Sequence, residues 1–86
     1  MTGSNRVLAE QALASKFNLM VTTVNSLGEE KENCIKMKKK EFFKQTEGIE
    51  LRVKLIDGYP SGEMEIDWLY IKKDGKSAWI KEREGE

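Results

Sequence analysis

The chain has 86 residues, enough for one domain, and its fifteen basic and fifteen acidic side chains leave no net charge. Balanced charge argues against a generally basic surface that coats nucleic acid. The absence of histidine excludes Ser-His and Cys-His catalytic arrangements and imidazole metal sites.

Cysteine usage and hydropathy indicate a cellular compartment. Cys34 is the single cysteine, so no internal disulfide can form, as is typical of the reducing cytoplasm. The N-terminal segment lacks the basic and apolar regions of a secretory signal, and no apolar run approaches the roughly 18 residues that span a membrane. We expect a cytoplasmic protein that binds no membrane and needs no cofactor or metal.

The first predicted element is a helix. Asn5 can cap a helix over residues 6–17, which is rich in alanine, leucine, glutamate and glutamine, after a flexible tail at residues 1–4. The apolar spacing would also allow one long helix that ends at Gly28. The stretch "LMVTTV", however, is dense in β-branched residues, which suit strands. We favour a strand over residues 18–25, and the long helix remains the alternative.

The middle of the chain carries weaker signals. Residues 25–33 are predicted as a loop, and residues 34–38 as a short strand. Residues 39–48 suggest a short helix or turn that ends at Gly48.

The last part of the chain predicts strands joined by turns. Residues 49–55 alternate apolar and charged side chains, as in a half-buried strand. Residues 57–62 contain proline and glycine and predict a turn. Residues 63–73 and 76–83 predict two strands that flank Asp74-Gly75, the strongest short hairpin signal.

These strands predict a three-stranded antiparallel meander over residues 49–83. The Asp74-Gly75 turn sets Tyr70 opposite Trp79, and the turn at 57–62 sets Leu51 opposite Trp68. One face of the meander then becomes the core beneath the N-terminal helix. That face comprises Ile49, Leu51, Val53, Leu55, Met64, Ile66, Trp68, Tyr70 and Trp79.

The other face of the meander carries a small apolar patch that something must cover. Either residues 18–47 fold back over it, or it is a surface for a protein partner or for self-association. The predicted partner-binding residues are Leu69, Ile71, Ala78 and Ile80, with a rim of Lys72, Lys76 and Lys81.

Nucleic-acid binding is the second hypothesis. The run "KMKKK" supplies Lys36, Lys38, Lys39 and Lys40 as candidate phosphate contacts, with the hairpin lysines beside them. Trp68, Tyr70 and Trp79 could stack nucleobases, but their shared face favours a role in the core. Neighbouring glutamates favour a solvated surface for the lysine run.

A remote resemblance concerns catalysis. The stretch "GEMEIDWLYIKKDGKSAWIKERE", residues 62–84, resembles the hairpin of PD-(D/E)xK nucleases. That resemblance implies metal ligands at Asp67 and Glu82, but the catalytic lysine position falls on Glu84 and departs from the pattern. The predicted register pairs Asp67 with Arg52 and Glu65 with Lys54 across the strands, and this charge pairing explains the acidic residues better.

The sequence therefore predicts an α+β fold, with an N-terminal helix on a twisted antiparallel sheet of three to five strands. A small Sm-like or SH3-like barrel is the alternative. Cys34 is expected to be a half-buried structural thiol. The favoured function is that of a small non-enzymatic binding or regulatory protein, such as an inhibitor or adaptor, that acts through protein–protein contacts.

Overall fold

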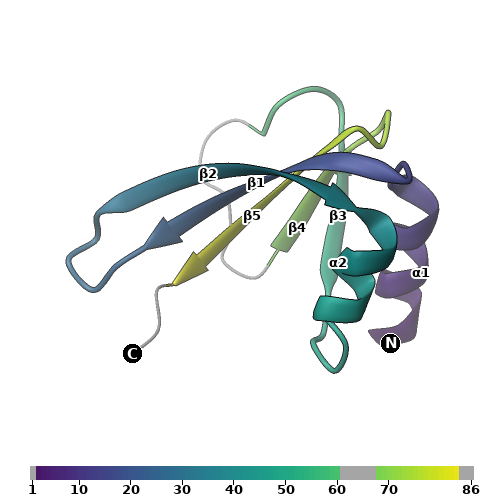
Figure 1. The fold of residues 1–86 in the computed structure, drawn as a ribbon, viewed down its shortest axis with the longest axis horizontal. Helices are drawn as coiled ribbons and strands as arrows, with labels where there is room; N and C mark the ends of the chain where they lie inside the picture. Colours follow the sequence, from purple (N-terminus) through teal and green to yellow (C-terminus); the bar gives the residue numbers. More distant parts are fainter. Residues whose placement is uncertain (1, 61–67, 84–86) are drawn as a thin grey trace.

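The computed structural model describes residues 2–60 and 68–83, and in these ranges two helices pack on a five-stranded sheet (Figure 1). The α+β prediction is confirmed, but the sheet is mixed rather than antiparallel. The strand order is β2-β1-β5-β4-β3. In chain order the elements are α1 (Thr2–Ala12), β1 (Lys16–Val24), β2 (Glu30–Lys38), α2 (Lys39–Gln45), β3 (Arg52–Ile56), β4 (Trp68–Lys72) and β5 (Ser77–Arg83).

The N-terminal prediction is right in kind but shifted. Helix α1 begins at Thr2, so the predicted tail is wrong there, and it ends at Ala12 instead of residue 17. Strand β1 follows at once and rules out the long helix. Its apolar residues are buried at period two, with Phe17 and Leu19 both facing the core. The β-branched residues of this segment thus decide between the two predictions.

Strand β2 is longer than predicted because the preceding loop is shorter. The Asn25 side chain accepts hydrogen bonds from the backbone N–H groups of Leu27 and Glu29, at 2.9 and 3.0 Å, and so closes a tight turn. Pairing with β1 resumes at Glu30. The charged residues that follow hide this strand from a hydrophobicity pattern because an edge strand needs few buried side chains. The short helix predicted after it is confirmed as α2.

The hairpin at Asp74-Gly75 is confirmed. Tyr70 pairs with Trp79, as predicted, in an antiparallel ladder between β4 and β5. The Gly75 N–H donates to the Lys72 carbonyl at 2.8 Å, and the φ of Gly75 is +73°, which glycine adopts without steric cost.

The meander is wrong because β3 and β4 run parallel. Val53 lies beside Leu69 and Leu55 beside Ile71, so aliphatic side chains share one face of the sheet. A tight turn at residues 57–62 could join only antiparallel strands, whereas this chain connects the end of β3 to the far end of β4. The predicted partners Met64 and Ile66 lie outside the described residues. The alternative of a barrel is also wrong, because β2 and β3 are the opposite edges of one open sheet in the described ranges.

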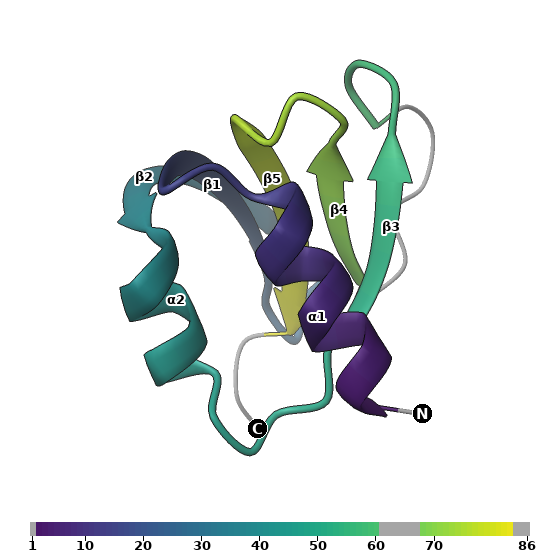
Figure 2. The same ribbon diagram turned by 90° about the vertical axis from the view of Figure 1, so that its right-hand side faces the viewer.

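Both helices cover the aliphatic face, as Figure 2 shows from the side of the helices. Ala9 and Leu13 of the α1 segment and Phe42 of α2 pack there with Val53 of β3 and with Leu51, which precedes that strand. The predicted core face was therefore largely the wrong one. The register puts Trp68, Tyr70 and Trp79 on the face without helices, and Ile49 and Leu55 are exposed at more than a third of their surface.

Trp79 on the helix-free face is contacted by Tyr59 from the loop after β3 rather than by a helix. The ring of Tyr59 meets the ring of Trp79 edge to face, with centroids 5.6 Å apart. The Lys72 ammonium lies 5.3 Å from the Tyr59 ring centroid. Residues that follow β3 thus form a small second layer over this face. None of the helices in the described part of the chain is long and apolar enough to cross a membrane.

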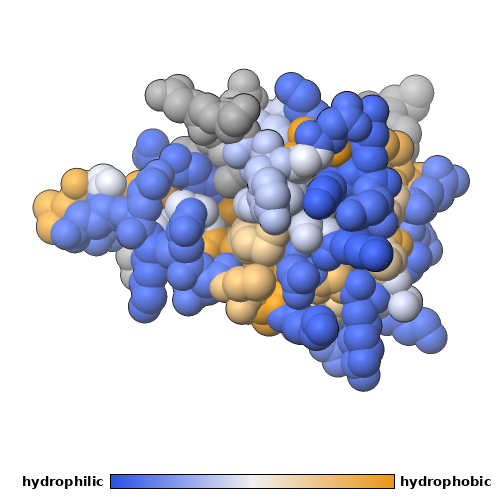
Figure 3. All heavy atoms as spheres, turned by 90° about the horizontal axis from the view of Figure 1, so that it is seen from above, coloured by the Kyte–Doolittle hydropathy of each residue, from blue (hydrophilic) through white to orange (hydrophobic). Residues whose placement is uncertain are grey.

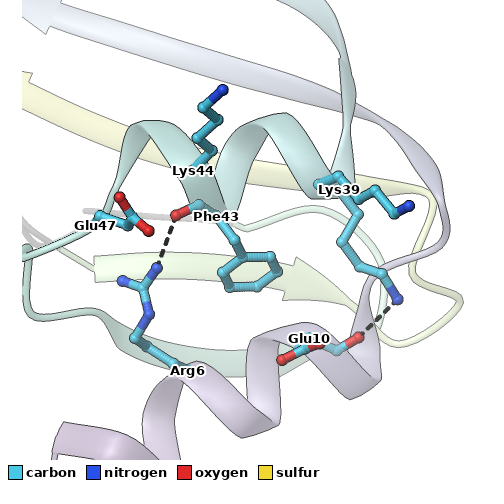
Figure 4. A pocket seen from close by; sticks show the side chains of 7 residues that line it. Arg6, Glu10, Lys39, Phe43, Lys44 and Glu47 are labelled. Atoms are coloured by element: carbon cyan, nitrogen blue, oxygen red, sulfur yellow. Dashed lines mark hydrogen bonds between the residues drawn. The ribbon is translucent and has the colours of Figure 1, made fainter.

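Each helix binds the C-terminal end of the other through a cation (Figure 4). The Arg6 guanidinium on α1 donates to the carbonyls of Phe43, Thr46 and Ile49 at 2.9–3.1 Å, just where α2 ends. The Lys39 ammonium on α2 donates to the Glu10 carbonyl at 3.0 Å, near the end of α1. Positive charge at a helix C-terminus satisfies free carbonyls and complements the helix dipole.

We expect Arg6→Ala to lower the free energy of unfolding by about 2 kcal/mol, because several charge-assisted hydrogen bonds are lost at once. Arg6→Lys should recover less than half of that loss, since an ammonium cannot reproduce the forked guanidinium. Urea unfolding measures both values, with Gln11→Ala as an exposed control on the same helix. A wild-type value for Arg6→Lys would contradict this role of the fork.

Candidate binding edge

The predicted apolar contact surface lies inside the protein. Leu69, Ile71 and Ala78 are at most 1% exposed, and Ile80 is half-buried against the same cluster. The cover comes from both helices, so the alternative that residues 18–47 cover the patch is right for α2, and α1 supplies the rest. Leu69, Ile71 and Ala78 are core and offer no surface to a partner in this structure, and only part of Ile80 is exposed, in a groove of about 320 Å³.

The three rim lysines make separate contacts and do not form one group. Lys72 faces Tyr59 and lies 3.8 Å from the Asp74 carboxylate. Lys81 makes an ion pair of 2.7 Å with Glu30 on β2. Lys76 is exposed in the hairpin turn. Because the predicted apolar patch is buried, these lysines do not surround a contact surface.

The lysine run is brought together with a further lysine from β1. Lys16 is the register partner of Lys38, and Lys36 lies on the same face of β2. Lys40 is exposed at the start of α2, whereas Lys39 is held by α1. A groove of about 270 Å³ runs among Ser15, Lys16, Lys38, Lys39 and Lys40.

The carboxylates of the nuclease resemblance do not form a described site. Glu82 is exposed on β5, on the helix-covered side of the sheet, while Asp67 and Glu84 lie outside the described residues. Within residues 2–60 and 68–83, no three histidine, cysteine or acidic residues cluster as metal ligands would.

The larger groove, of about 560 Å³, separates α1 from α2. Its cationic groups include Arg6 and Lys39, which are already bonded to helix carbonyls across the gap (Figure 4). Phe43 is its apolar wall. The groove is therefore the boundary between the two helices, and Arg6 and Lys39 in it stabilise the packing of one helix on the other.

Strand β2 is the exposed edge of the sheet. It pairs with β1 on one side and with no other described strand, and Met37 alone among its residues is half-buried. The β1–β2 hairpin extends beyond the rest of the molecule (Figure 1). Figure 3 shows a mostly hydrophilic surface from above, with a hydrophobic spot at the tip of this hairpin, where Leu27 is 82% exposed. A long unpaired edge is a template for another strand.

The hydrogen bonds at the two ends of the hairpin show which backbone groups of β2 face outward. The Asn25 N–H donates to the Glu29 carbonyl at 3.0 Å, and the Lys39 N–H donates to the Ser15 carbonyl at 2.8 Å. Hydrogen-bonded pairs alternate along an antiparallel ladder, so the odd-numbered residues of β2 bond to β1. The outward N–H and C=O groups belong to Glu30, Glu32, Cys34, Lys36 and Lys38.

Charge is segregated along this outward set. Glu30 and Glu32 precede Cys34, and Lys36 and Lys38 follow it. All five side chains project from the helix-free face, since the register aligns Cys34 with Met20 and Met20 with Trp79. Among the described residues only Glu30 of this set makes a salt bridge. The edge therefore carries an acidic end and a basic end that its own fold leaves largely uncompensated.

Cys34 lies at the centre of this set and is exposed rather than half-buried, so the expectation of a structural thiol is wrong. Its sulfur lies 3.7 Å from the sulfur of Met20 on β1. On an edge strand, the side chains of the residues with outward backbone groups can remain exposed to solvent. The position of Cys34 therefore does not require its thiol to be buried.

The sequence pattern does not predict this edge, because it predicts a loop over residues 25–33. The signal is charge at alternate positions on either side of Cys34, acidic at Glu30 and Glu32 and basic at Lys36 and Lys38. Compared with known proteins, the chain matches no family model, no curated protein and no solved structure, so its function must be inferred from its own geometry.

Proposed function

We propose that this chain is a small non-enzymatic binding protein of the cytoplasm that works through protein–protein contacts, as a regulator, inhibitor or adaptor. Its contact element is the outer edge of β2, to which a strand of the partner is added. The observation that carries the proposal is the row of outward backbone groups from Glu30 to Lys38, which no described strand pairs.

Strand addition explains several features of the edge together. Backbone hydrogen bonds supply affinity, and exposed side chains at alternate positions supply specificity. Glu32 and Lys36 carry opposite charges on either side of the centre of the edge. They favour a partner strand, antiparallel or parallel, that places a basic residue opposite Glu32 and an acidic residue opposite Lys36. The β1–β2 hairpin extends beyond the rest of the molecule, so the acidic end of the β2 edge lies away from both helices (Figure 1).

A proline at the centre of the edge tests the proposal. Cys34→Pro removes an outward N–H and leaves the β1–β2 ladder intact, because proline is tolerated on an edge strand with its nitrogen toward solvent. Cys34→Val is the matched control, since it loses the thiol but keeps the N–H. Tagged wild type and both variants are compared for proteins retained from extract of the source cells.

The expected result is a protein retained by wild type and Cys34→Val but at least about tenfold depleted with Cys34→Pro, since a central ladder bond is lost. Circular dichroism and urea unfolding should show that Cys34→Pro stays folded. If every retained protein binds Cys34→Pro as well as wild type, strand addition at β2 is refuted.

A second candidate function is nucleic-acid binding, favoured by the position of Lys16 beside Lys38. Lys36 and Lys40 extend this basic group, and an anion bound there would relieve their repulsion. Residues of the predicted run thus remain candidates, without Lys39, whose ammonium is engaged by α1.

Salt dependence distinguishes the two candidates. If phosphates bind at the lysines, affinity for a short single- or double-stranded oligonucleotide should fall steeply with salt, with a slope of roughly one unit per contact. Lys16→Glu and Lys38→Glu should each abolish that binding, while Lys54→Glu, on β3 at the opposite edge of the sheet, should not. Fluorescence anisotropy at low salt measures this, and no binding at micromolar protein excludes the second candidate.

A further inference from the structure

We infer that the strand added to β2 is the β2 strand of a second copy of this chain, paired antiparallel about a two-fold axis at Cys34. This inference rests on the proposed function and names its partner. It follows from the order of charges along the edge, which is complementary to itself when the strand is reversed.

The outward backbone groups restrict the register. Only even-numbered residues of β2 present free N–H and C=O groups, so a ladder forms only where even-numbered residues oppose each other. Among these registers, one uses every outward residue of the strand. It places Cys34 opposite Cys34 of the second copy, at the symmetry axis.

The same register aligns opposite charges. Glu32 faces Lys36 of the second copy, Glu30 faces Lys38 of the second copy, and symmetry repeats both contacts. Moving the second strand by two residues in either direction, the smallest shift that keeps even-numbered residues opposite each other, keeps only one kind of charge pair and leaves an outward residue unpaired. Opposite-charge pairs directly across strands stabilise a sheet, whereas like charges destabilise it. Backbone geometry and charge thus select one register independently.

The other face of the strand is compatible with this contact. Ile35 is 46% exposed on the helix-covered side of the sheet, toward the outer edge. In the selected register it lies beside Asn33 of the second copy and diagonal to Ile35 of the second copy, within reach of a branched side chain. The dimer would therefore join two sheets edge to edge and remove one exposed edge from each copy.

Charge exchange tests the inference. Sedimentation velocity from low micromolar to near-millimolar protein, under reducing conditions, should show a wild-type dimer. Glu32→Lys and Lys36→Glu should each weaken it at least about tenfold, because each puts like charges opposite each other twice. An equimolar mixture of the two variants should dimerise as wild type does, and so should the double variant Glu32→Lys/Lys36→Glu. Lys31→Glu, on the same strand but the other face, is the control and should leave the dimer unchanged.

A second readout uses the thiol at the axis. A short bismaleimide should link two wild-type chains through Cys34 and fail to link Glu32→Lys alone. A wild type that stays monomeric throughout overturns the inference, as does a dimer that ignores both charge variants. The proposed function is tested separately. If the wild type stays monomeric but retains another protein that Cys34→Pro does not retain, the proposed function holds and this inference fails.

Discussion

Leu69→Ala is expected to lower the free energy of unfolding by about 2–5 kcal/mol. The side chain is 1% exposed, in the cluster that joins the sheet to both helices. Its loss removes buried apolar surface and leaves a cavity that a close-packed core cannot fully close. In a domain of this size, with total stability at the low end of about 5–15 kcal/mol, that change is a large part of the whole.

Leu27→Ala is the matched control, because Leu27 is 82% exposed at the hairpin tip. It should change the free energy of unfolding by no more than about 0.5 kcal/mol. Urea or thermal unfolding of both variants gives the comparison. Similar values for the two would mean that Leu69 is a surface residue after all and would restore the predicted contact patch on β4 and β5.

Gly75→Ala is expected to cost at least about 3 kcal/mol for two separate reasons. Its φ of +73° is strained for any residue with a Cβ. An added Cβ would also overlap the backbone carbonyl oxygen of Ala12, at the end of α1. Backbone cannot move aside as a flexible side chain can, so the hairpin turn must separate from the helix. The bond from the Ala14 N–H to the Gly75 carbonyl, 2.9 Å long, would be lost with it.

Gly28→Ala distinguishes the cost of the positive φ from the cost of the steric overlap. Gly28 has a φ of +82°, but a Cβ there would meet no other atom within 4 Å. Its cost should be limited to the conformational strain, about 1–2 kcal/mol. Equal losses of stability for the two glycine variants, measured by urea unfolding, would disprove the close approach of the β4–β5 turn to the end of α1.

The elements that local chemistry determines could be predicted from the sequence. Asp74-Gly75 encodes a tight turn, closed by the bond from the Gly75 N–H to the Lys72 carbonyl, and the turn fixes the register of β4 on β5. The β-branched run in β1 encodes a strand despite its helix-like spacing. In both places the residues that set the conformation are adjacent in sequence, so the pattern contains the answer.

The pairing of β3 with β4 could not be predicted, because it depends on which face the helices cover. An antiparallel and a parallel arrangement both bury alternate residues of β3, and the proline and glycines after Ile56 suit a turn as well as a longer connection. The choice is made by packing: Val53, Leu69 and Ile71 fit beneath α1 as one aliphatic layer. The aromatic rings then fall on the opposite face, where Tyr59 contacts Trp79.

Part of the candidate site could be predicted from the sequence. The sequence predicts a solvated surface for the lysine run, and the structure adds Lys16 to it. The edge itself was missed because edge position is a property of the sheet and not of the strand. Once β2 is placed at the edge, the alternation of Glu30, Glu32, Lys36 and Lys38 becomes meaningful, since it decides which charges lie beside the outward backbone groups.

Amide hydrogen exchange along β2, followed by NMR at low and at high protein concentration, tests the role of this edge most directly. In dilute protein the N–H groups of Asn33 and Ile35, which face β1, should exchange slowly, and those of Glu32, Cys34 and Lys36 should exchange fast. At high concentration the even-numbered amides should become slow as well, because a second β2 strand bonds to them. Even-numbered amides that exchange equally fast at every concentration would contradict pairing of this edge with a second copy.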